Sequence, residues 1–166
     1  MRNIILIGFM GCGKTTAGKM LAQRLGFEFI DTDEYIEKKT GKTISEIFAE
    51  VGEGYFRRME TQALREVCGR KKTVISTGGG IVTVSDNIDI LKSAGRVYFI
   101  NTPIEIIFER LTEDTVRPLL KNGEEKAREL YNGRLSLYKK AADYIIEKNS
   151  SDEVCAEILA ANERKD

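Results

Sequence analysis

Gly8-Phe9-Met10-Gly11-Cys12-Gly13-Lys14-Thr15 directly follows the apolar run Ile4-Ile5-Leu6-Ile7. The stretch fits the pattern G-x-x-x-x-G-K-[ST], and a buried strand before it with a helical pattern after it is the context that this pattern requires. Glycines let the backbone curl so that its N–H groups can cradle phosphate oxygens. The helix that begins at the loop directs its positive dipole end at the same anion. The sequence therefore predicts a nucleoside triphosphate site.

Two side chains of this loop have defined tasks. Lys14 reaches the β- and γ-phosphates, and the Thr15 hydroxyl is placed to ligate Mg²⁺. The residues expected to contact the nucleotide phosphates are Gly11, Cys12, Gly13, Lys14, Thr15 and Thr16.

The length and charge of the chain narrow the possibilities. A chain of 166 residues suits one domain with a sizeable core, so residues 1–166 are predicted to form a single domain. Lys+Arg and Asp+Glu both number 26, so we expect neither nucleic acid nor a membrane surface as a partner. The three scattered cysteines favour a reducing cytoplasm. The absence of histidine excludes Ser-His-Asp and Cys-His catalysis.

Five short apolar runs alternate with helical patterns along the chain. The runs are nearly continuous in apolar residues, as expected when helices cover both faces of a parallel sheet. The alternation predicts a doubly wound α/β fold with a five-stranded parallel sheet. The predicted strands are Asn3–Ile7, Phe27–Ile30, Thr73–Ser76, Arg96–Ile100 and Tyr144–Glu147.

Three segments have the pattern of a capping box, in which a hydroxyl and a carboxylate satisfy the first backbone groups of a helix. The second of them also has Pro103 at the expected first helical position. The three segments are Thr43–Glu46, Thr102–Glu105 and Ser150–Glu153.

Residues 112–128 fit the alternating pattern poorly. This stretch is charged, contains Pro118 and Gly123, and has few apolar side chains. It is either a solvated surface loop or a mobile lid, over approximately residues 112–124, that excludes water from a reaction. The nucleotide site favours the lid, in which Arg117 could supply positive charge to a transition state.

Asp31 and Asp33 follow the second predicted strand. Ligands of open α/β sheets collect at the carboxyl ends of the strands, so both carboxylates can face the same crevice as the phosphate loop. One could sit near Mg²⁺, for which Asp31 is favoured, and the other could accept a proton from a substrate hydroxyl. Alternatively, Asp33 is the N-cap of a helix that begins at Glu34.

Arg57 and Glu60 are three residues apart on a predicted helix and can pair on one face. From spacing alone, an ordinary surface ion pair without function is the expectation. The sequence Gly78-Gly79-Gly80 follows the third strand, where bare backbone suits close approach of a ligand and a plain turn is the alternative.

Taken together, these segments resemble shikimate kinases, which are small P-loop kinases with a three-layer α/β/α fold. The Phe-Arg-x-x-Glu element, the triple glycine and a later Arg-x-x-x-Tyr are more discriminating than the phosphate loop. The matching stretches are Gly8–Thr16, Asp31–Asp33, Gly52–Glu60, Gly78–Gly80, Val116–Leu120 and Arg134–Tyr138.

The resemblance implies transfer of the ATP γ-phosphate to the 3-hydroxyl of shikimate. It assigns Asp33 to the attacking hydroxyl and both Arg57 and Arg134 to the shikimate carboxylate, with a backbone N–H of Gly79 assisting. Bidentate arginine forks suit a planar carboxylate, which accounts for local positive charge in a neutral chain.

On the nucleotide side, the resemblance implies that Thr15 and Asp31 organise Mg²⁺ and that Arg117 closes on the phosphates, where Lys14 also acts. Arg110 is expected near the adenine. The expected partners are therefore ATP and shikimate, and the expected state is a monomer.

Three other functions are compatible with parts of the pattern. The nearest is a related kinase acting on another polyol acid such as gluconate. A GTP-binding switch protein is disfavoured because the sequence has no Asn-Lys-x-Asp motif. A nucleic-acid-associated ATPase is disfavoured by the balanced charge and the lack of basic runs.

Overall fold

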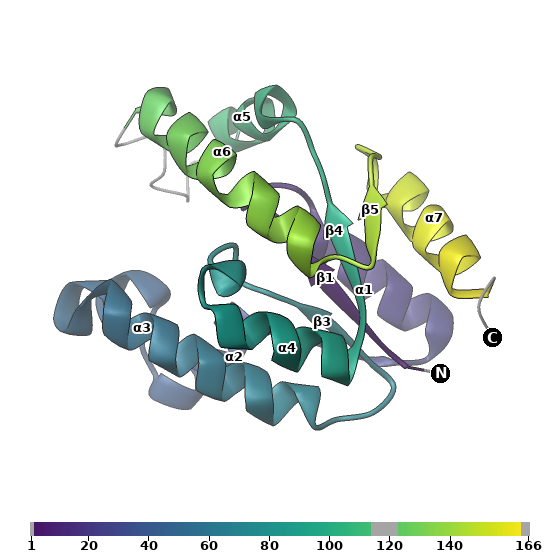
Figure 1. Ribbon diagram of the computed structural model, residues 1–166, viewed down its shortest axis with the longest axis horizontal. Coiled ribbons are helices and arrows are strands. Elements are labelled where there is room, and N and C mark those ends of the chain that lie inside the picture. The colour runs from purple at the N-terminus through teal and green to yellow at the C-terminus, as the bar shows by residue number, and fades with distance from the viewer. Residues whose placement is uncertain (1, 114–122, 164–166) are drawn as a thin grey trace.

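The computed structural model describes residues 2–113 and 123–163 of the chain. Strands and helices alternate through most of this length (Figure 1). The elements in chain order are β1 (Asn3–Ile7), α1 (Lys14–Leu25), β2 (Glu28–Asp31), α2 (Thr32–Thr40), α3 (Ile44–Cys68), β3 (Thr73–Ser76), the 3₁₀ turn η1 (Ile81–Thr83), α4 (Ser85–Ala94), β4 (Gly95–Ile100), α5 (Ile104–Glu113), α6 (Glu124–Ala141), β5 (Tyr144–Ile146) and α7 (Ser151–Glu163).

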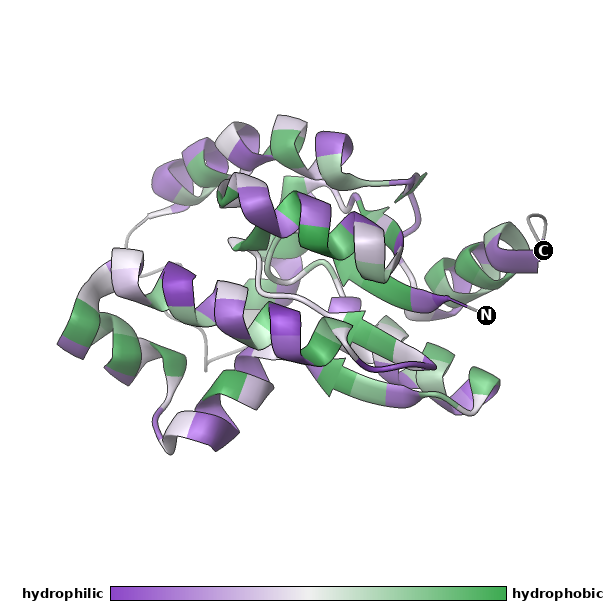
Figure 2. Ribbon diagram, turned by 60° about the horizontal axis from the view of Figure 1, so that its bottom comes forward, coloured by the Kyte–Doolittle hydropathy of each residue, from purple (hydrophilic) through white to green (hydrophobic). Residues whose placement is uncertain are grey.

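The five strands form one parallel sheet in the order β2-β3-β1-β4-β5. Helices α1 and α7 pack together on one face, whereas α3, α4 and α6 cover the other, which gives three layers (Figure 1). All five residues of the central strand β1 are buried, and the strands are the most apolar part of the ribbon (Figure 2). The predicted α/β fold with a five-stranded parallel sheet is confirmed.

The strand boundaries differ slightly from the predicted ones. The prediction placed the second strand at Phe27–Ile30, but β2 runs from Glu28 to Asp31. The Phe27 N–H bonds to the carbonyl of Ala22 at the end of α1, so it is not available to the sheet. The shift matters because it puts Asp31 in register with Ser76 at the end of β3.

Two of the three expected capping boxes are found at helix starts. Thr43 and Glu46 cap α3 reciprocally, and the Ser150 hydroxyl accepts the N–H of Glu153 at the start of α7. The prediction for Thr102 was wrong, because α5 begins at Ile104 and Pro103 rather than Thr102 directly precedes it. The Thr102 hydroxyl donates to the carbonyl of Cys12 in the phosphate loop at 3.2 Å. This bond ties the end of β4 to the loop.

Helix α3 bends at Gly52, whose φ of 73° and ψ of 170° lie outside helical values. On both sides of the bend, α3 contributes to a small apolar cluster with α2 that is separate from the main core. The cluster is formed by Ile36, Ile47, Phe56 and Ala63. It anchors the segment that carries Arg57 and Glu60 against α2. Among residues 2–113 and 123–163, no helix is long and apolar enough to cross a membrane.

Candidate active site

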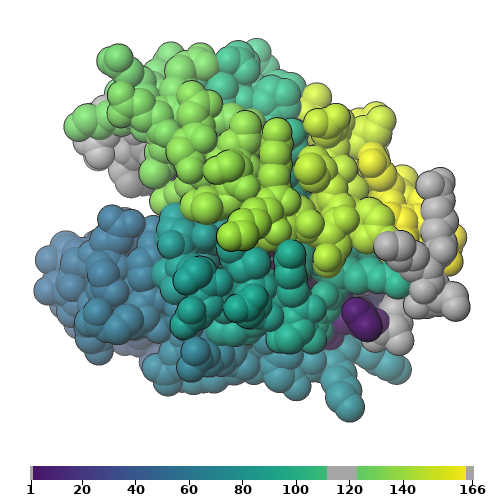
Figure 3. Space-filling model, viewed as in Figure 1, coloured from purple at the N-terminus to yellow at the C-terminus, as the bar shows by residue number. Residues whose placement is uncertain are grey.

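The carboxyl ends of β1, β2 and β3 meet at a pocket of about 810 Å³. In the space-filling view, the surface is hollowed between α3 and α6 (Figure 3). The pocket contains nearly all of the predicted nucleotide residues together with Asp31, Asp33 and Gly79. Its lining residues are Met10, Gly11, Gly13, Lys14, Thr15, Thr16, Asp31, Asp33, Glu34, Glu37, Ile44, Ser76, Thr77, Gly79, Arg110, Leu111, Asn149, Ser150 and Ser151.

The loop between β1 and α1 has the curled backbone that its glycines predicted. Gly11 and Gly13 have φ values of 78° and 92°, a region that side chains with a Cβ rarely adopt. The Lys14 side chain is buried and its Nζ donates to the carbonyls of Gly8 at 2.8 Å and Phe9 at 3.0 Å. Carbonyl groups of the loop thus hold the Lys14 ammonium group at the pocket.

Thr15 and Asp31 lie together beside this loop. The Thr15 hydroxyl donates to Asp31 Oδ2 at 3.0 Å, and the hydroxyl of Ser76 donates to the same oxygen at 3.0 Å. A hydroxyl that gives its proton to a carboxylate keeps its lone pairs for a cation. Hydroxyl and carboxylate oxygens are the ligand types that Mg²⁺ prefers, so these residues fit a magnesium ion bound to the nucleotide.

The structure rejects the alternative that Asp33 is a helix cap. Helix α2 begins two residues earlier than that alternative required, and its cap is Asp31, whose Oδ1 accepts the N–H groups of Asp33 and Glu34. Asp33 Oδ1 is buried without a hydrogen-bond partner among the described residues. Burial and the nearby Asp31 carboxylate raise the pKa of Asp33 from 3.8 to about 7. A carboxyl group with this pKa beside a nucleotide site can accept a proton near neutral pH.

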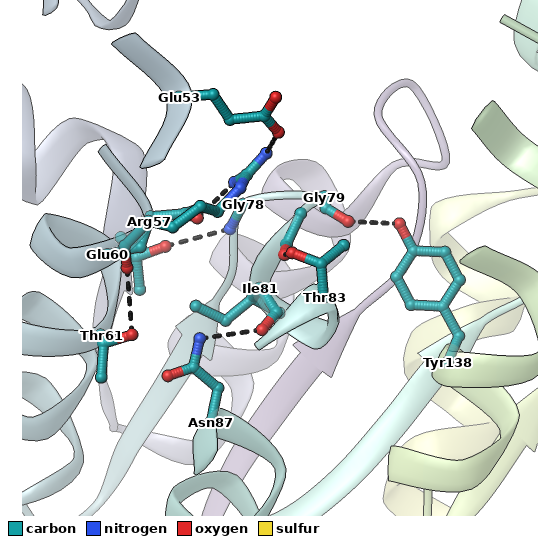
Figure 4. A network of polar contacts seen from close by, with 12 residues as sticks. Glu53, Arg57, Glu60, Thr61, Gly78, Gly79, Ile81, Thr83, Asn87 and Tyr138 are labelled. Atoms are coloured by element: carbon teal, nitrogen blue, oxygen red, sulfur yellow. Dashed lines mark hydrogen bonds and ion pairs between the residues drawn. The ribbon is translucent and has the colours of Figure 1, made fainter. Parts of the chain in front are cut away.

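The Arg57–Glu60 pair is buried, so the expectation of a surface ion pair was wrong. The Glu60 side chain is 1% exposed and the Arg57 side chain 14%. Arg57 Nη1 bonds to Glu60, and Nη2 bonds to Glu53 Oε1 at 3.0 Å (Figure 4). Burial raises the pKa of Glu60, and the Arg57 guanidinium opposes that rise. Two carboxylates therefore fix the arginine fork in one orientation.

The triple glycine is explained by the side chains of the protein itself. A Cβ at position 78 would lie 2.6 Å from Glu60 Oε1 and 2.8 Å from Asp33 Oδ1, and one at position 80 would overlap the Arg57 guanidinium. Only at Gly79, which lines the pocket, are the nearest atoms 3.5 Å or more from an added Cβ. Gly78 and Gly80 therefore make room for Asp33, Glu60 and Arg57, and the expected approach of a ligand to bare backbone stays a prediction for Gly79.

Helix α6 contributes to the other side of the glycine segment. Arg134 is 8% exposed, and its Nε is buried without a partner among the described residues. One turn later, the hydroxyl of the fully buried Tyr138 donates to the carbonyl of Gly79 at 2.5 Å (Figure 4). The structure thus places Arg57 and Arg134 next to the same segment, although neither lines the pocket itself.

Arg110 connects the phosphate loop with the segment before α7. Its Nη1 donates to the carbonyl of Gly11 at 3.1 Å, and its Nη2 donates to that of Asn149. Both Arg110 and Asn149 line the pocket, as a place near the adenine requires. Arg117 and most of the predicted lid lie outside the described residues.

Comparison with known proteins identifies the family. The family model described as shikimate kinase matches residues 10–163. The chain belongs to the shikimate kinase family. The shikimate kinase of Thermodesulfovibrio yellowstonii is 45% identical over 99% of this chain and 96% of its own, and that of Persephonella marina is 48% identical over 85% and 86%. The structure of the Acinetobacter baumannii shikimate kinase in complex with shikimate superimposes with a TM-score of 0.93, at 44% identity, over 99% of this chain and 95% of that one.

Three residues of this shikimate kinase site were given no role from the sequence. Ser76 donates to the Asp31 oxygen that also accepts from Thr15, Glu53 contacts Arg57, and Tyr138 contacts Gly79. Ser76 had a usable signal, because it ends the strand next to Asp31. Glu53 and Tyr138 had none beyond their family motifs, since their partners depend on how helices pack.

The steric role of Gly80 gives a first prediction. Gly80→Ala should raise the KM for an acid bound by Arg57 by about 10-fold or more, because the added methyl group displaces the guanidinium. Gly133→Ala, where a Cβ meets nothing within 4 Å, is the matched control and should leave that KM unchanged. Steady-state kinetics of both variants measure this KM, and circular dichroism checks that both variants fold. A KM of Gly80→Ala equal to that of Gly133→Ala would contradict the steric role of Gly80.

Proposed function

We propose that this chain transfers the γ-phosphoryl group of ATP to the 3-hydroxyl of shikimate, giving shikimate 3-phosphate and ADP. The observation that carries the proposal is a single pocket that joins the Lys14 loop to the buried, unpartnered carboxyl of Asp33. Arg57 packs against Gly80 and Arg134 acts on the charge of Glu60, so both lie along the glycine segment next to Asp33 and supply the cations that an organic acid needs. Membership of the shikimate kinase family supports the choice of acid.

The nucleotide side holds and neutralises the triphosphate. Lys14 turns from its two loop carbonyls to the β- and γ-phosphates, which present a stronger negative charge. Thr15 and Asp31 would hold Mg²⁺, which when bound offsets the charge of the phosphate oxygens. Arg110 contacts the adenosine end, and Arg117 adds positive charge from the lid. The roles of Arg117 and of a lid over residues 112–124 rest on the resemblance to the family.

The residues that bind the substrate carboxylate determine which hydroxyl of the substrate reacts. Arg57 and Arg134 bind the carboxylate of shikimate, and a backbone N–H at Gly79 assists. With the carboxylate fixed, the 3-hydroxyl faces Asp33, which accepts its proton as the oxygen attacks the γ-phosphorus and ADP leaves. Positioning and charge neutralisation are the main requirements of phosphoryl transfer, so a site without histidine suffices.

We further infer that residues 1–166 work as one domain, as a monomer and in the cytoplasm. The three cysteines are free, which suits a reducing compartment. The numbers of acidic and basic residues are equal, which gives nucleic acid no net attraction.

A coupled assay of ADP release tests the function. ATP hydrolysis should be slow without an acceptor and rise sharply with shikimate, and ³¹P NMR should show a phosphate monoester on the 3-hydroxyl. A panel of acids that includes gluconate separates this activity from the related polyol-acid kinases. ADP release that responds to gluconate and not to shikimate would overturn the proposal.

The carboxylate clamp makes a second prediction. Arg57→Lys keeps a cation beside Glu60 but removes the planar fork, so the KM for shikimate should rise about 10–100-fold while that for ATP changes less than about 2-fold. Arg58→Lys is the matched control, because Arg58 is an exposed neighbour whose guanidinium lies over the Tyr55 ring. Parallel increases in both KM values for Arg57→Lys would show that the clamp is misassigned.

A further inference from the structure

The triple-glycine segment and Ile81, which follows it, are held by side chains that come from four places in the chain. Thr32 of α2 accepts the Gly78 N–H at 3.0 Å, and Asn87 of α4 donates to the Ile81 carbonyl at 2.9 Å. Thr83, at the end of η1, donates to the Gly80 carbonyl at 2.7 Å. The fourth contact, from Tyr138 to the Gly79 carbonyl, is the one among these that comes from α6 (Figure 4).

The peptide between Gly79 and Gly80 needs such a contact more than most. A glycine on each side lets a peptide rotate at little steric cost, because neither residue has a Cβ to block the alternatives. The Tyr138 hydroxyl selects one orientation by bonding the carbonyl oxygen of this peptide. Burial raises the pKa of Tyr138, so the hydroxyl keeps its proton and remains a donor.

The orientation of the Gly79–Gly80 peptide also fixes the direction of the Gly80 N–H. No peptide bond in the described part of the chain is cis, so the Gly80 N–H points away from the Gly79 carbonyl and therefore away from Tyr138. Tyr138 and Arg57 lie on opposite sides of the segment (Figure 4). The Gly80 N–H thus faces the side on which the Arg57 guanidinium packs against Gly80.

Tyr138 also links this peptide to Arg134. The two side chains are four residues apart on α6 and so lie on the same face of the helix. The Tyr138 ring stacks on Phe99 of β4, with centroids 5.0 Å apart, which seats the helix on the sheet. The Arg134 guanidinium is also within hydrogen-bonding reach of the Tyr138 hydroxyl, so loss of this hydroxyl would remove a contact that holds Arg134 beside the glycine segment.

We propose that Tyr138 is a positioning residue for the acid-binding side: its hydroxyl fixes the Gly79–Gly80 peptide and keeps Arg134 in register with it. The inference deepens the proposed function and rests on it for the identity of the acid. It assigns Tyr138 no contact with the reacting atoms. A residue acting in this way should affect binding of the acid and leave binding of the nucleotide alone.

Tyr138→Phe tests the proposal because it removes the hydroxyl and keeps the stacked ring. The KM for shikimate should rise about 3–10-fold, as expected for the loss of one buried hydrogen bond, while kcat and the KM for ATP change less than about 2-fold. Tyr98→Phe is the matched control. Tyr98 is also fully buried and stacked, with its ring centroid 5.2 Å from that of Tyr144, and it contributes nothing to the pocket lining.

A second measurement needs no turnover. In protein labelled with ¹⁵N-glycine, Tyr138→Phe should shift or broaden the amide signals of Gly79 and Gly80 in the unliganded state, and Tyr98→Phe should not. If wild-type protein fails to phosphorylate shikimate, the proposed function fails and these signals alone decide the role of Tyr138. Unchanged glycine signals, or equal increases in the KM values for shikimate and ATP, would overturn the proposal.

Discussion

Lys14→Ala should lower kcat/KM for phosphoryl transfer by about 10²–10³-fold, because it removes a preorganised cation from the developing phosphate charge. The variant should fold, since among the residues that the structure describes the Lys14 ammonium bonds only to atoms of its own loop, namely the carbonyls of Gly8 and Phe9 and the Cys12 sulfur. The coupled ADP assay measures the loss, and a thermal melt followed by circular dichroism measures stability.

Lys19→Ala is the control for this loss of charge. Lys19 is an exposed lysine of the same helix, with its Nζ 5.7 Å from the centroid of the Phe29 ring. It should retain wild-type kinetics. Turnover by Lys14→Ala at the wild-type rate would remove the loop from the catalytic site.

Asp33→Asn should lower kcat by about 10²–10⁴-fold, the range for loss of a general base. In the wild type, kcat/KM for shikimate should rise with pH as Asp33, whose pKa is about 7 in the unliganded protein, loses its proton. The residual activity of the variant should lack that rise. A pH–rate profile of both proteins, with ATP saturating, measures the difference. An unchanged profile in Asp33→Asn would assign the titration to another group.

The same substitution should stabilise the fold. The folded protein keeps the Asp33 proton up to about pH 7, whereas the unfolded chain releases it near pH 3.8. The folded state therefore binds more protons between these values, and Asp33 makes it progressively less stable as the pH rises through this window. Asparagine carries no charge, so the gain in Tm of Asp33→Asn should be larger at about pH 8 than at about pH 5.

These melts are to be made without nucleotide and with a chelator, so that no bound ligand alters the charge around Asp33. Asp86→Asn, at an aspartate near the start of α4 and away from the pocket, controls for loss of a carboxylate. A gain in Tm for Asp33→Asn that is the same at both pH values would contradict the raised pKa.

Local signals in the sequence were sufficient for the architecture. Continuous apolar runs predicted the strands within one residue at each end, because strands buried on both faces need an apolar side chain at nearly every position. The glycine-rich loop was predicted for a similar reason, since its backbone shape depends on residues that are adjacent in the chain.

The two aspartates at the end of β2 could not be told apart from the neighbouring sequence alone. Asp31 and Asp33 are both plausible helix caps by sequence, and the choice depends on the residue at which α2 begins. In the structure Asp31 takes the N–H groups, and Asp33 is left buried with an unpartnered oxygen. Asp33 lies with Glu60 of α3 against Gly78, and no pattern near Asp33 indicates those distant neighbours.

The amino-acid sequence by itself determined the phosphate loop, the parallel sheet and the family motifs, because each depends on neighbours within a few residues. Only the tertiary structure decided that the Arg57–Glu60 pair is buried and that Tyr138 holds Gly79, a residue 59 positions away. Spacing along a helix shows which side chains share a face, but the solvent exposure of that face is set by what packs on it. The strength of an ion pair or a hydrogen bond follows from that exposure.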